Sequence, residues 1–314
     1  MIIPQCLQLG DVVGLTAPAS PASLETIHLA VKGLEKLGVK VVVGETCYQA
    51  ESNYISASPQ KRAAELMAMF TNKKIKAIFC LRGGYGTVHI LPFLNYLVIR
   101  QNPKWLVGYS DITALHIAIQ QNSGLASIHG AMPATELIDT DSFTFQSLQD
   151  TLFSHKSMEI TNPKGERIYT LSHGQTSGPI IGGNLAVITS LLGTPYEIQT
   201  KKKLLFIEEI AEPIYKIDRM LTQLAMTGKL YDAKAIILGS FTNCEEKQEK
   251  LQLEKTIRTI IAPYQKPCIY NVRAGHCKPT ISFRLGQVVQ LKTLGIQNSY
   301  IQFINCRDND GRIV

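Results

Sequence analysis

The hydrophobic and polar positions of the first half of the chain form short apolar runs separated by amphipathic stretches. The apolar runs predict strands at 11–17, 39–43, 75–80, 105–109 and 125–129. Between the first two runs, apolar residues recur at helical spacing from Leu24 to Leu34, and Ser20-Pro21 predicts the N-cap and first-turn proline of that helix. Ser58-Pro59 predicts a second helix, to about Phe70, in the same way. This βαβα order indicates a parallel sheet with helices on both faces.

The second half is patterned differently. Residues 156–177, around Asn162-Pro163-Lys164-Gly165, have weak periodicity and predict a connection between domains. Beyond them we expect a glycine-rich turn into a helix at Gly182-Gly183-Asn184, strands at 204–208 and 233–241, a helix at 213–226, and β-structure at 281–291 and 300–304. The pattern therefore predicts an α/β chain with a first domain at 1–155 and a second at 178–314.

Composition supports a compact two-domain protein. The chain has 314 residues, of which 45% are hydrophobic and 18% charged, a balance that excludes extended disorder. The net charge is +7, but the basic residues are scattered among acids, and the only run of three is Lys201-Lys202-Lys203. This excludes a nucleic-acid stripe or a polybasic membrane anchor. The excess is compatible with an anionic ligand.

Cysteine usage and the start of the chain predict a cytoplasmic location. The seven cysteines are widely spaced and contain no C-x-x-C pair: Cys6, Cys47, Cys80, Cys244, Cys268, Cys277 and Cys306. Such a set favours a reducing compartment. Met1–Gln5 lacks the basic start and apolar run of a signal peptide. The uncharged stretch 168–196 is long enough to span a bilayer, but its polar residues, glycines and prolines make it a poor membrane helix.

Two glycine-containing turns follow predicted strands. Gly108-Tyr109-Ser110-Asp111 predicts a strand, a sharp turn and a helix, which would expose Ser110 above the sheet as a nucleophile; the alternative is that Ser110 only caps the helix. Arg82-Gly83-Gly84-Tyr85-Gly86 could aim backbone N–H groups at an anion or a developing oxyanion, or it could simply be a tight turn.

Two further strand ends carry an acid and a base. Glu208-Glu209 directly follows an apolar run, and His276 lies in a loop after Cys268–Val272. Ligands bind at the carboxyl ends of strands in open α/β sheets, so Ser110, Glu208 and His276 could converge there and supply nucleophile, orienting acid and base. Each of these residues could instead be an ordinary surface or hydrogen-bonding group.

Other chemistry has weaker support. The seven histidines contain no close ligand pair and the cysteines do not cluster, so we expect no metal site. His116 and His129 are expected to be packing residues or residues behind the site, with His129 the fallback base. Cys277 is either a thiol nucleophile or a small buried apolar residue.

Taken together, the motifs resemble the serine L,D-carboxypeptidases, a family that includes murein tetrapeptide carboxypeptidases and microcin C immunity peptidases. The likeness covers nearly the whole chain. Its further motifs are Gly10-Asp11-Val12-Val13-Gly14, Ala17-Pro18-Ala19-Ser20-Pro21, Gly193-Thr194-Pro195, Tyr215-Lys216-Ile217-Asp218-Arg219-Met220-Leu221 and Gly275-His276.

The resemblance implies an N-terminal Rossmann-like domain, a C-terminal α/β domain rich in β-structure, and catalytic groups that meet between them. It implies a triad of Ser110, Glu208 and His276, with the backbone N–H groups of Asp111 and Gly84 as the oxyanion hole. Glu208 is preferred to Glu209 because the family's acid is the first acidic residue after the strand. Arg82, Gly83 and Tyr85 are weaker candidates for substrate binding, and Arg82 could instead form a structural ion pair.

The implied reaction is cleavage of the L,D-peptide bond before the terminal D-alanine of recycled murein tetrapeptides, by a homodimer without cofactor. One alternative keeps the triad and changes the substrate to a peptidyl or aminoacyl sulfamoyl adenylate. A second alternative is a non-catalytic Rossmann-like protein that binds a phosphorylated ligand.

Overall fold

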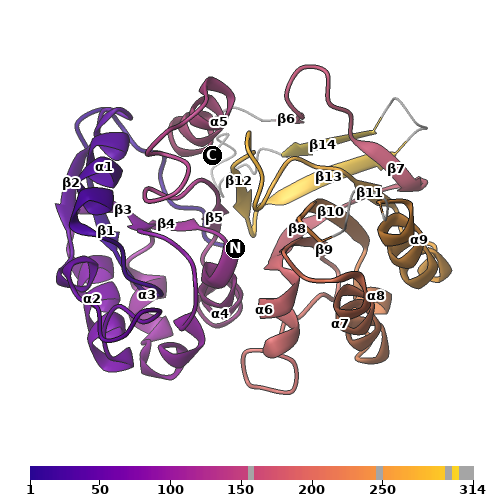
Figure 1. Cartoon of the computed structure of the whole chain (residues 1–314), viewed down its shortest axis with the longest axis horizontal. Helices are drawn as coiled ribbons and strands as arrows, with labels where there is room; N and C mark the ends of the chain where they lie inside the picture. Colours follow the sequence, from indigo (N-terminus) through magenta and orange to yellow (C-terminus); the bar gives the residue numbers. More distant parts are fainter. Residues whose placement is uncertain (155–158, 245–249, 294–298, 304–314) are drawn as a thin grey trace. The chain divides into compact units, whose positions relative to one another are not determined.

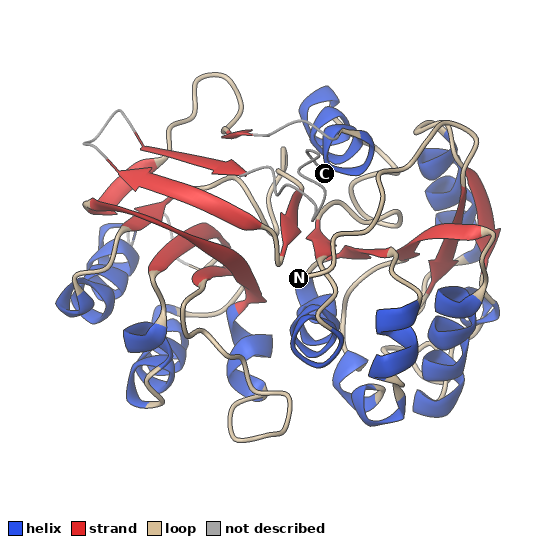
Figure 2. Ribbon diagram, turned by 180° about the vertical axis from the view of Figure 1, so that it is seen from behind, coloured by secondary structure: helices blue, strands red, loops and turns tan. Residues whose placement is uncertain are grey.

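The computed structural model describes residues 1–154, 159–244, 250–293 and 299–303, which form two compact units (Figures 1 and 2). The first unit contains Met1–Ser154 together with Ser282–Gly286, and the second contains the other described residues.

The first unit is built on a six-stranded sheet. Its strands are β1 (Val12–Thr16), β2 (Lys40–Val43), β3 (Ile75–Cys80), β4 (Trp105–Gly108), β5 (Ser127–His129) and β12 (Phe283–Leu285). The order is β12-β5-β4-β3-β1-β2, and β1 to β5 are parallel whereas β12 is antiparallel to β5. The predicted parallel sheet is confirmed, and all five predicted strands are present.

Helices cover both faces of this sheet, as the βαβα pattern predicts. They are α1 (Leu24–Glu35), α2 (Pro59–Thr71), α3 (Tyr96–Gln101), α4 (Thr113–Ser123) and α5 (Ser142–Phe153). Short 3₁₀ turns occupy η1 (Glu45–Tyr48), η2 (Thr87–His89), η3 (Leu91–Phe93) and η4 (Ser110–Ile112). Val13 and Leu15 face a buried apolar cluster that includes residues of α1 and α5. Gly14 faces Met69 of α2 on the opposite side.

One predicted helix start is wrong. Ser58 caps α2 through Lys61 N, as expected, but α1 is capped by Ser23 rather than Ser20. The Ser20 hydroxyl is used elsewhere, because it donates to Tyr54 O at 2.7 Å and accepts from Tyr85 N at 3.3 Å. Ser20 therefore anchors the glycine-rich loop instead of a helix.

The second unit has an eight-stranded sheet of order β6-β14-β13-β8-β9-β10-β11-β7. Its strands are β6 (Glu159–Ile160), β7 (Tyr169–Ser172), β8 (Gly174–Asn184), β9 (Leu204–Ile210), β10 (Ala235–Thr242), β11 (Cys268–Tyr270), β13 (Val288–Thr293) and β14 (Ser299–Phe303). The neighbours β8, β9, β10 and β11 are parallel, and the other pairs are antiparallel. This agrees with the expected β-rich α/β domain.

The helices of the second unit lie on one side of its sheet in both views (Figures 1 and 2). They are α6 (Leu185–Ser190), α7 (Ile214–Met226), α8 (Lys229–Asp232) and α9 (Lys250–Ile261), with a 3₁₀ turn η5 (Ala262–Tyr264). Within the described ranges, no helix is long and apolar enough to cross a membrane. The uncharged stretch 168–196 instead forms β7, β8 and α6.

The unit boundaries differ from the expected ones in two places. The stretch 156–177, expected as a connection, includes β6, β7 and the start of β8. The first residues of β8 alternate between half-buried and exposed and carry polar side chains, so no apolar run marks them. Residues 282–286, expected in the second domain, belong to the first unit because β12 pairs with β5.

Candidate active site

Ser110 lies directly after β4 in a left-handed backbone conformation, with φ of 64°. Residues other than glycine adopt this region at a cost in strain, which occurs where a turn must present a side chain. Ser110 is not the N-cap of α4. Ile112 occupies that position, and no side chain forms a capping hydrogen bond to the helix. The strand, turn and helix predicted around Ser110 are therefore present as β4, η4 and α4.

The glycine-rich loop after β3 lies against this serine. A Cβ atom at Gly83 would be 2.8 Å from Ser110 Cβ and 2.9 Å from Ser110 Oγ, so only glycine fits. Gly84 has φ of 113°, and a Cβ there would collide with the Ser20 hydroxyl. Gly83 therefore allows the loop backbone to approach Ser110 closely, and Gly84 allows it to approach Ser20.

The proposed oxyanion donors belong to these two turns. Among the described residues, neither Gly84 N–H nor Asp111 N–H is engaged in a hydrogen bond to another protein group. The Asp111 side chain is buried and accepts from Thr87 N at 2.9 Å. Burial raises the pKa of this carboxyl, and the hydrogen bonds from Thr87 oppose that rise. The Asp111 side chain thus has a structural task, and the role of its N–H group stays a prediction.

Replacing Gly83 with alanine is expected to lower the reactivity of Ser110 about tenfold to a hundredfold, because the new methyl group must displace Ser110 or the loop, and small displacements of reacting groups have effects of that size. The rate at which a serine-reactive phosphonate labels Ser110, with thermal unfolding measured in parallel, tests this. Gly10→Ala is the control: a methyl group at Gly10 would meet no atom within 4 Å, and since φ there is 87°, alanine strains only the backbone. Equal rates for the Gly83 variant and the unmodified protein would contradict the close approach.

In the second unit, the structure places His276 against Glu208. His276 Nδ1 lies 2.8 Å from Glu208 Oε2, and His276 N–H donates to the same oxygen at 3.3 Å. The Glu208 side chain is fully buried, whereas that of His276 is 15% exposed. Gly275, with φ of 104°, makes this possible because a Cβ there would collide with the Glu208 carboxylate. A buried carboxylate at this position fixes the orientation of the His276 ring and favours the tautomer with its proton on Nδ1.

Glu209 points to other partners. Its carboxylate accepts from Asn184 Nδ2 at 2.8 Å, from Ala186 N at 2.7 Å and from its neighbour Ile210 N at 2.8 Å. These bonds hold the first turn of α6. Burial raises the pKa of Glu209, opposed by the same hydrogen bonds. Of the two adjacent acids, only Glu208 hydrogen bonds to His276 among the contacts described.

Arg82 and Tyr85 lie at the surface of the first unit. Arg82 is exposed, and its nearest polar contact is Pro21 O at 3.5 Å from Nη1; it forms no ion pair with any residue that the structure describes. Tyr85 is 48% exposed, and its ring centroid lies 6.1 Å from that of Tyr54 and 5.3 Å from that of His89. No sequence pattern marks Tyr54, because it is an isolated tyrosine in a loop.

The other candidate residues, His116, His129 and Cys277, are buried or partly buried within the fold. His116 is buried and hydrogen bonds to Gly108 O at 2.8 Å, and burial lowers its pKa to about 4. His129 is buried and stacks on Phe283, with ring centroids 5.3 Å apart. Burial raises the pKa of the Cys277 thiol, which disfavours a thiolate at neutral pH. Cys306 lies outside the described residues.

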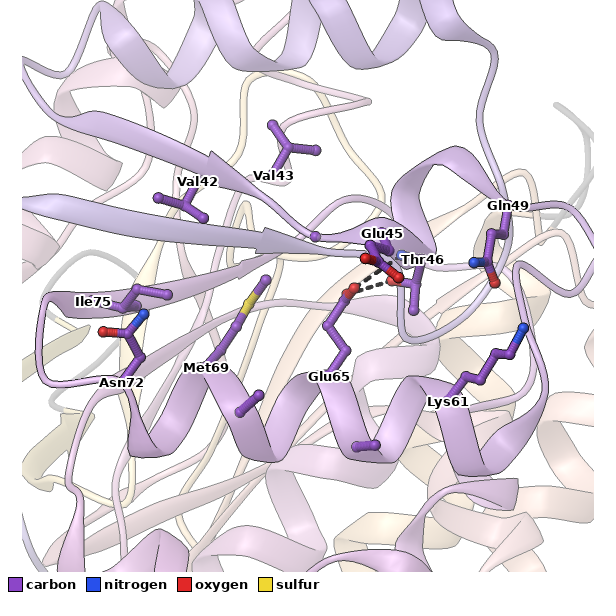
Figure 3. A pocket seen from close by; sticks show the side chains of 13 residues that line it. Val42, Val43, Glu45, Thr46, Gln49, Lys61, Glu65, Met69, Asn72 and Ile75 are labelled. Atoms are coloured by element: carbon purple, nitrogen blue, oxygen red, sulfur yellow. Dashed lines mark hydrogen bonds between the residues drawn. The ribbon is translucent and has the colours of Figure 1, made fainter.

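No cluster of three or more metal-ligating side chains occurs in the described part of the chain. A pocket of about 520 Å³ lies between β2 and α2 (Figure 3), lined by none of the predicted site residues. Glu65 points into it and accepts from Thr46 N at 2.9 Å and from Thr16 Oγ at 2.6 Å. Glu65 therefore fastens the end of β1. In the sequence, Glu65 is recognisable only as a charged residue beside the apolar residues of the helix that follows Ser58-Pro59.

The sequence matches two family models along most of its length. Residues 13–130 match the LD-carboxypeptidase N-terminal domain, and residues 177–291 match the LD-carboxypeptidase C-terminal domain.

Individual proteins show the same similarity. The chain is 39% identical to a probable murein peptide carboxypeptidase of Bacillus subtilis (strain 168), over 92% of this chain and 91% of that protein. It is 29% identical to the murein tetrapeptide carboxypeptidase of Pseudomonas aeruginosa, over 89% and 92% of the two chains. Among solved structures, an MccF-like protein from Bacillus anthracis str. Ames superposes with a TM-score of 0.87 and 27% identity, covering 97% of this chain and 99% of the other.

Proposed function

Because the chain belongs to the LD-carboxypeptidase family, we propose that it releases the terminal D-alanine of murein tetrapeptides by cleaving the L,D-peptide bond before it. Membership makes the chain a carboxypeptidase rather than a non-catalytic ligand-binding protein. The observation that carries the mechanism is the 2.8 Å hydrogen bond between buried Glu208 and His276 Nδ1. It supplies an oriented base, and the strained turn at Ser110 supplies a nucleophile.

The proposed mechanism uses Ser110, Glu208 and His276 as a triad. His276 removes the hydroxyl proton of Ser110 as the oxygen attacks the carbonyl carbon of the residue before D-alanine. The N–H groups of Gly84 and Asp111 stabilise the negative charge on the carbonyl oxygen. The C–N bond then breaks and the amine of D-alanine leaves with the proton from His276. Water, deprotonated by the same histidine, hydrolyses the acyl-enzyme and regenerates Ser110.

A carboxypeptidase must also recognise the free carboxylate of its substrate. Arg82 is the proposed partner, because it is exposed, is adjacent in sequence to Gly83, and has no acidic partner among the described side chains. A guanidinium binds a carboxylate through two parallel hydrogen bonds. Gly83 and Tyr85 would complete the substrate contacts on the same loop.

Purified protein incubated with murein tetrapeptide is expected to release free D-alanine, detected by chromatography or by a coupled oxidase assay. The matched control is the same peptide ending in L-alanine, which should be cleaved far more slowly. Absence of D-alanine release, in protein shown to be folded, would contradict the proposed substrate.

A second candidate substrate is a peptidyl or aminoacyl sulfamoyl adenylate. The observation that favours it is the exposed pair Tyr54 and Tyr85, since aromatic faces stack on nucleobases. Parallel assays with both substrates separate the candidates by their kcat/KM values.

We further propose a cytoplasmic homodimer. The six cysteines of the described part are free thiols, which supports a reducing compartment. The dimer is inferred from the family resemblance alone, and sedimentation velocity of the purified chain tests it: a monomer at micromolar concentration would contradict it.

A further inference from the structure

Arg62 of α2 is buried behind the glycine-rich loop. It is fully inaccessible to solvent, and its guanidinium donates to three carbonyl groups from separate segments of the first unit. Nε donates to Ala57 O at 2.7 Å, and Nη1 donates to Pro18 O at 2.5 Å and to Gly86 O at 2.9 Å. Arg62 therefore joins the segment after β1, the segment before α2 and the end of the glycine-rich loop.

Stability alone is a poor explanation for this cation. Arg62 Nη2 is buried and has no hydrogen-bond partner among the described residues. Burial lowers the pKa of Arg62, and the negative charge of Asp111 opposes the effect. Burying a charge that is only partly hydrogen bonded is often no better for stability than an apolar side chain of similar volume. What the guanidinium does provide is a fixed geometry for the three carbonyl groups.

The same loop is fastened to the nucleophile turn by a second set of contacts. Thr87, next to Gly86, donates through its N–H to Asp111 Oδ2 at 2.9 Å and through its hydroxyl to Asp111 O at 2.6 Å. Asp111 directly follows Ser110. The two turns that carry the oxyanion donors are thus tied together at Thr87 and tied to α2 at Gly86.

We propose that Arg62 is a positioning residue, which acts with the Thr87–Asp111 contacts to hold the glycine-rich loop at the distance from Ser110 that oxyanion stabilisation requires. This rests on the proposed serine mechanism. Arg62 touches no substrate; it fixes Gly86, and through it the nearby N–H of Gly84, relative to the N–H of Asp111. Removing one oxyanion donor typically lowers kcat by about 10²–10³-fold, and a donor displaced by a fraction of an ångström should have a smaller but measurable effect.

The test is Arg62→Met, which keeps an unbranched side chain and removes the hydrogen bonds. We expect kcat for D-alanine release to fall at least about tenfold while KM changes less than about threefold. The matched control is Arg284→Met. Arg284 is also buried in the first unit, and it donates to Thr151 O from Nε at 3.0 Å and to Ser154 O from Nη2 at 2.7 Å, away from the loop. Thermal unfolding of both variants is measured in parallel to verify that each is folded, and only Arg62→Met should lose kcat.

A second pair of variants covers the case in which Arg62→Met does not fold. Thr87→Val removes the hydroxyl that donates to Asp111 O and should lower kcat. Thr87→Ser keeps the hydroxyl and should retain most of the kcat of the unmodified protein. If Thr87→Val turns over within about twofold of the unmodified protein, or if Arg284→Met loses as much kcat as Arg62→Met, the positioning role is overturned.

The rate at which a fluorophosphonate labels Ser110 gives a readout that does not depend on the murein substrate. Unmodified protein that is labelled but releases no D-alanine would refute the proposed substrate, and the labelling rates of Arg62→Met and Arg284→Met would still decide the role of Arg62. We expect slower labelling in Arg62→Met only. Equal labelling rates in the two variants would overturn the inference even if D-alanine release confirms the substrate.

Discussion

Ser110→Ala is expected to abolish D-alanine release, with kcat lowered by about 10⁴–10⁶-fold. The change removes the only atom that forms the acyl-enzyme in the proposed mechanism, and loss of the serine in comparable triads has an effect of this size. The measurement is D-alanine release over long incubations, so that a residual rate can be quantified, together with mass spectrometry for a phosphonate adduct. The variant should form no adduct.

A matched serine variant separates this effect from general damage. Ser123 is buried near the end of α4, where its hydroxyl donates to Ile119 O at 2.6 Å. Ser123→Ala removes a hydroxyl from the helix that follows the nucleophile turn, and its kcat should stay near that of the unmodified protein. Substantial release of D-alanine by Ser110→Ala would remove Ser110 from the mechanism.

Glu208→Gln is expected to lower kcat by about 10³–10⁴-fold, with a much smaller change in KM. The carboxamide still fits beside His276 Nδ1 but no longer stabilises the imidazolium that forms during attack. It also does not enforce the tautomer in which Nε2 carries no proton and can accept one. Steady-state kinetics on murein tetrapeptide, with circular dichroism to verify folding, provide the measurement.

The adjacent carboxylate is the natural control. Glu209→Gln changes the same functional group one residue further along β9, but Glu209 holds Asn184 and the first turn of α6 rather than His276. We expect Glu209→Gln to lower the free energy of unfolding by about 1–3 kcal/mol, because buried donors lose an acceptor, and to leave kcat within a few-fold. The reverse result, with Glu209→Gln the slow variant, would show that Glu208 is not the triad acid.

The sequence predicts the parts of the site that depend on strand ends. Apolar runs mark β3, β4 and β9. Arg82 and Ser110 lie two residues after the ends of β3 and β4, and Glu208 lies near the end of β9. The parallel sheet follows from the βαβα order for the same reason: buried strands are apolar throughout and are easy to recognise.

Elements that depend on partners distant in sequence are harder to predict. The first residues of β8 are polar and partly exposed, so local periodicity does not reveal the strand. They pair with β13, which lies more than 100 positions further along the chain. Ser20 has the local features of an N-cap, but its hydroxyl bonds to Tyr54 and Tyr85. Arg62 is typical of an exposed helix position by residue type, and only the fold shows that it is buried.

The short strand β12 has a consequence for how the protein is made. The first unit obtains its edge strand and the buried Arg284 from residues 282–286, whereas the rest of the unit ends at Ser154. During synthesis the ribosome must therefore translate most of the second unit before β5, which already pairs with β4, receives its second neighbour. Domains usually fold in order as they leave the ribosome. Here the sheet of the first unit is completed by a segment that follows most of the second unit, and a gene fragment that stops near codon 155 encodes a sheet in which β5 is an unpaired edge.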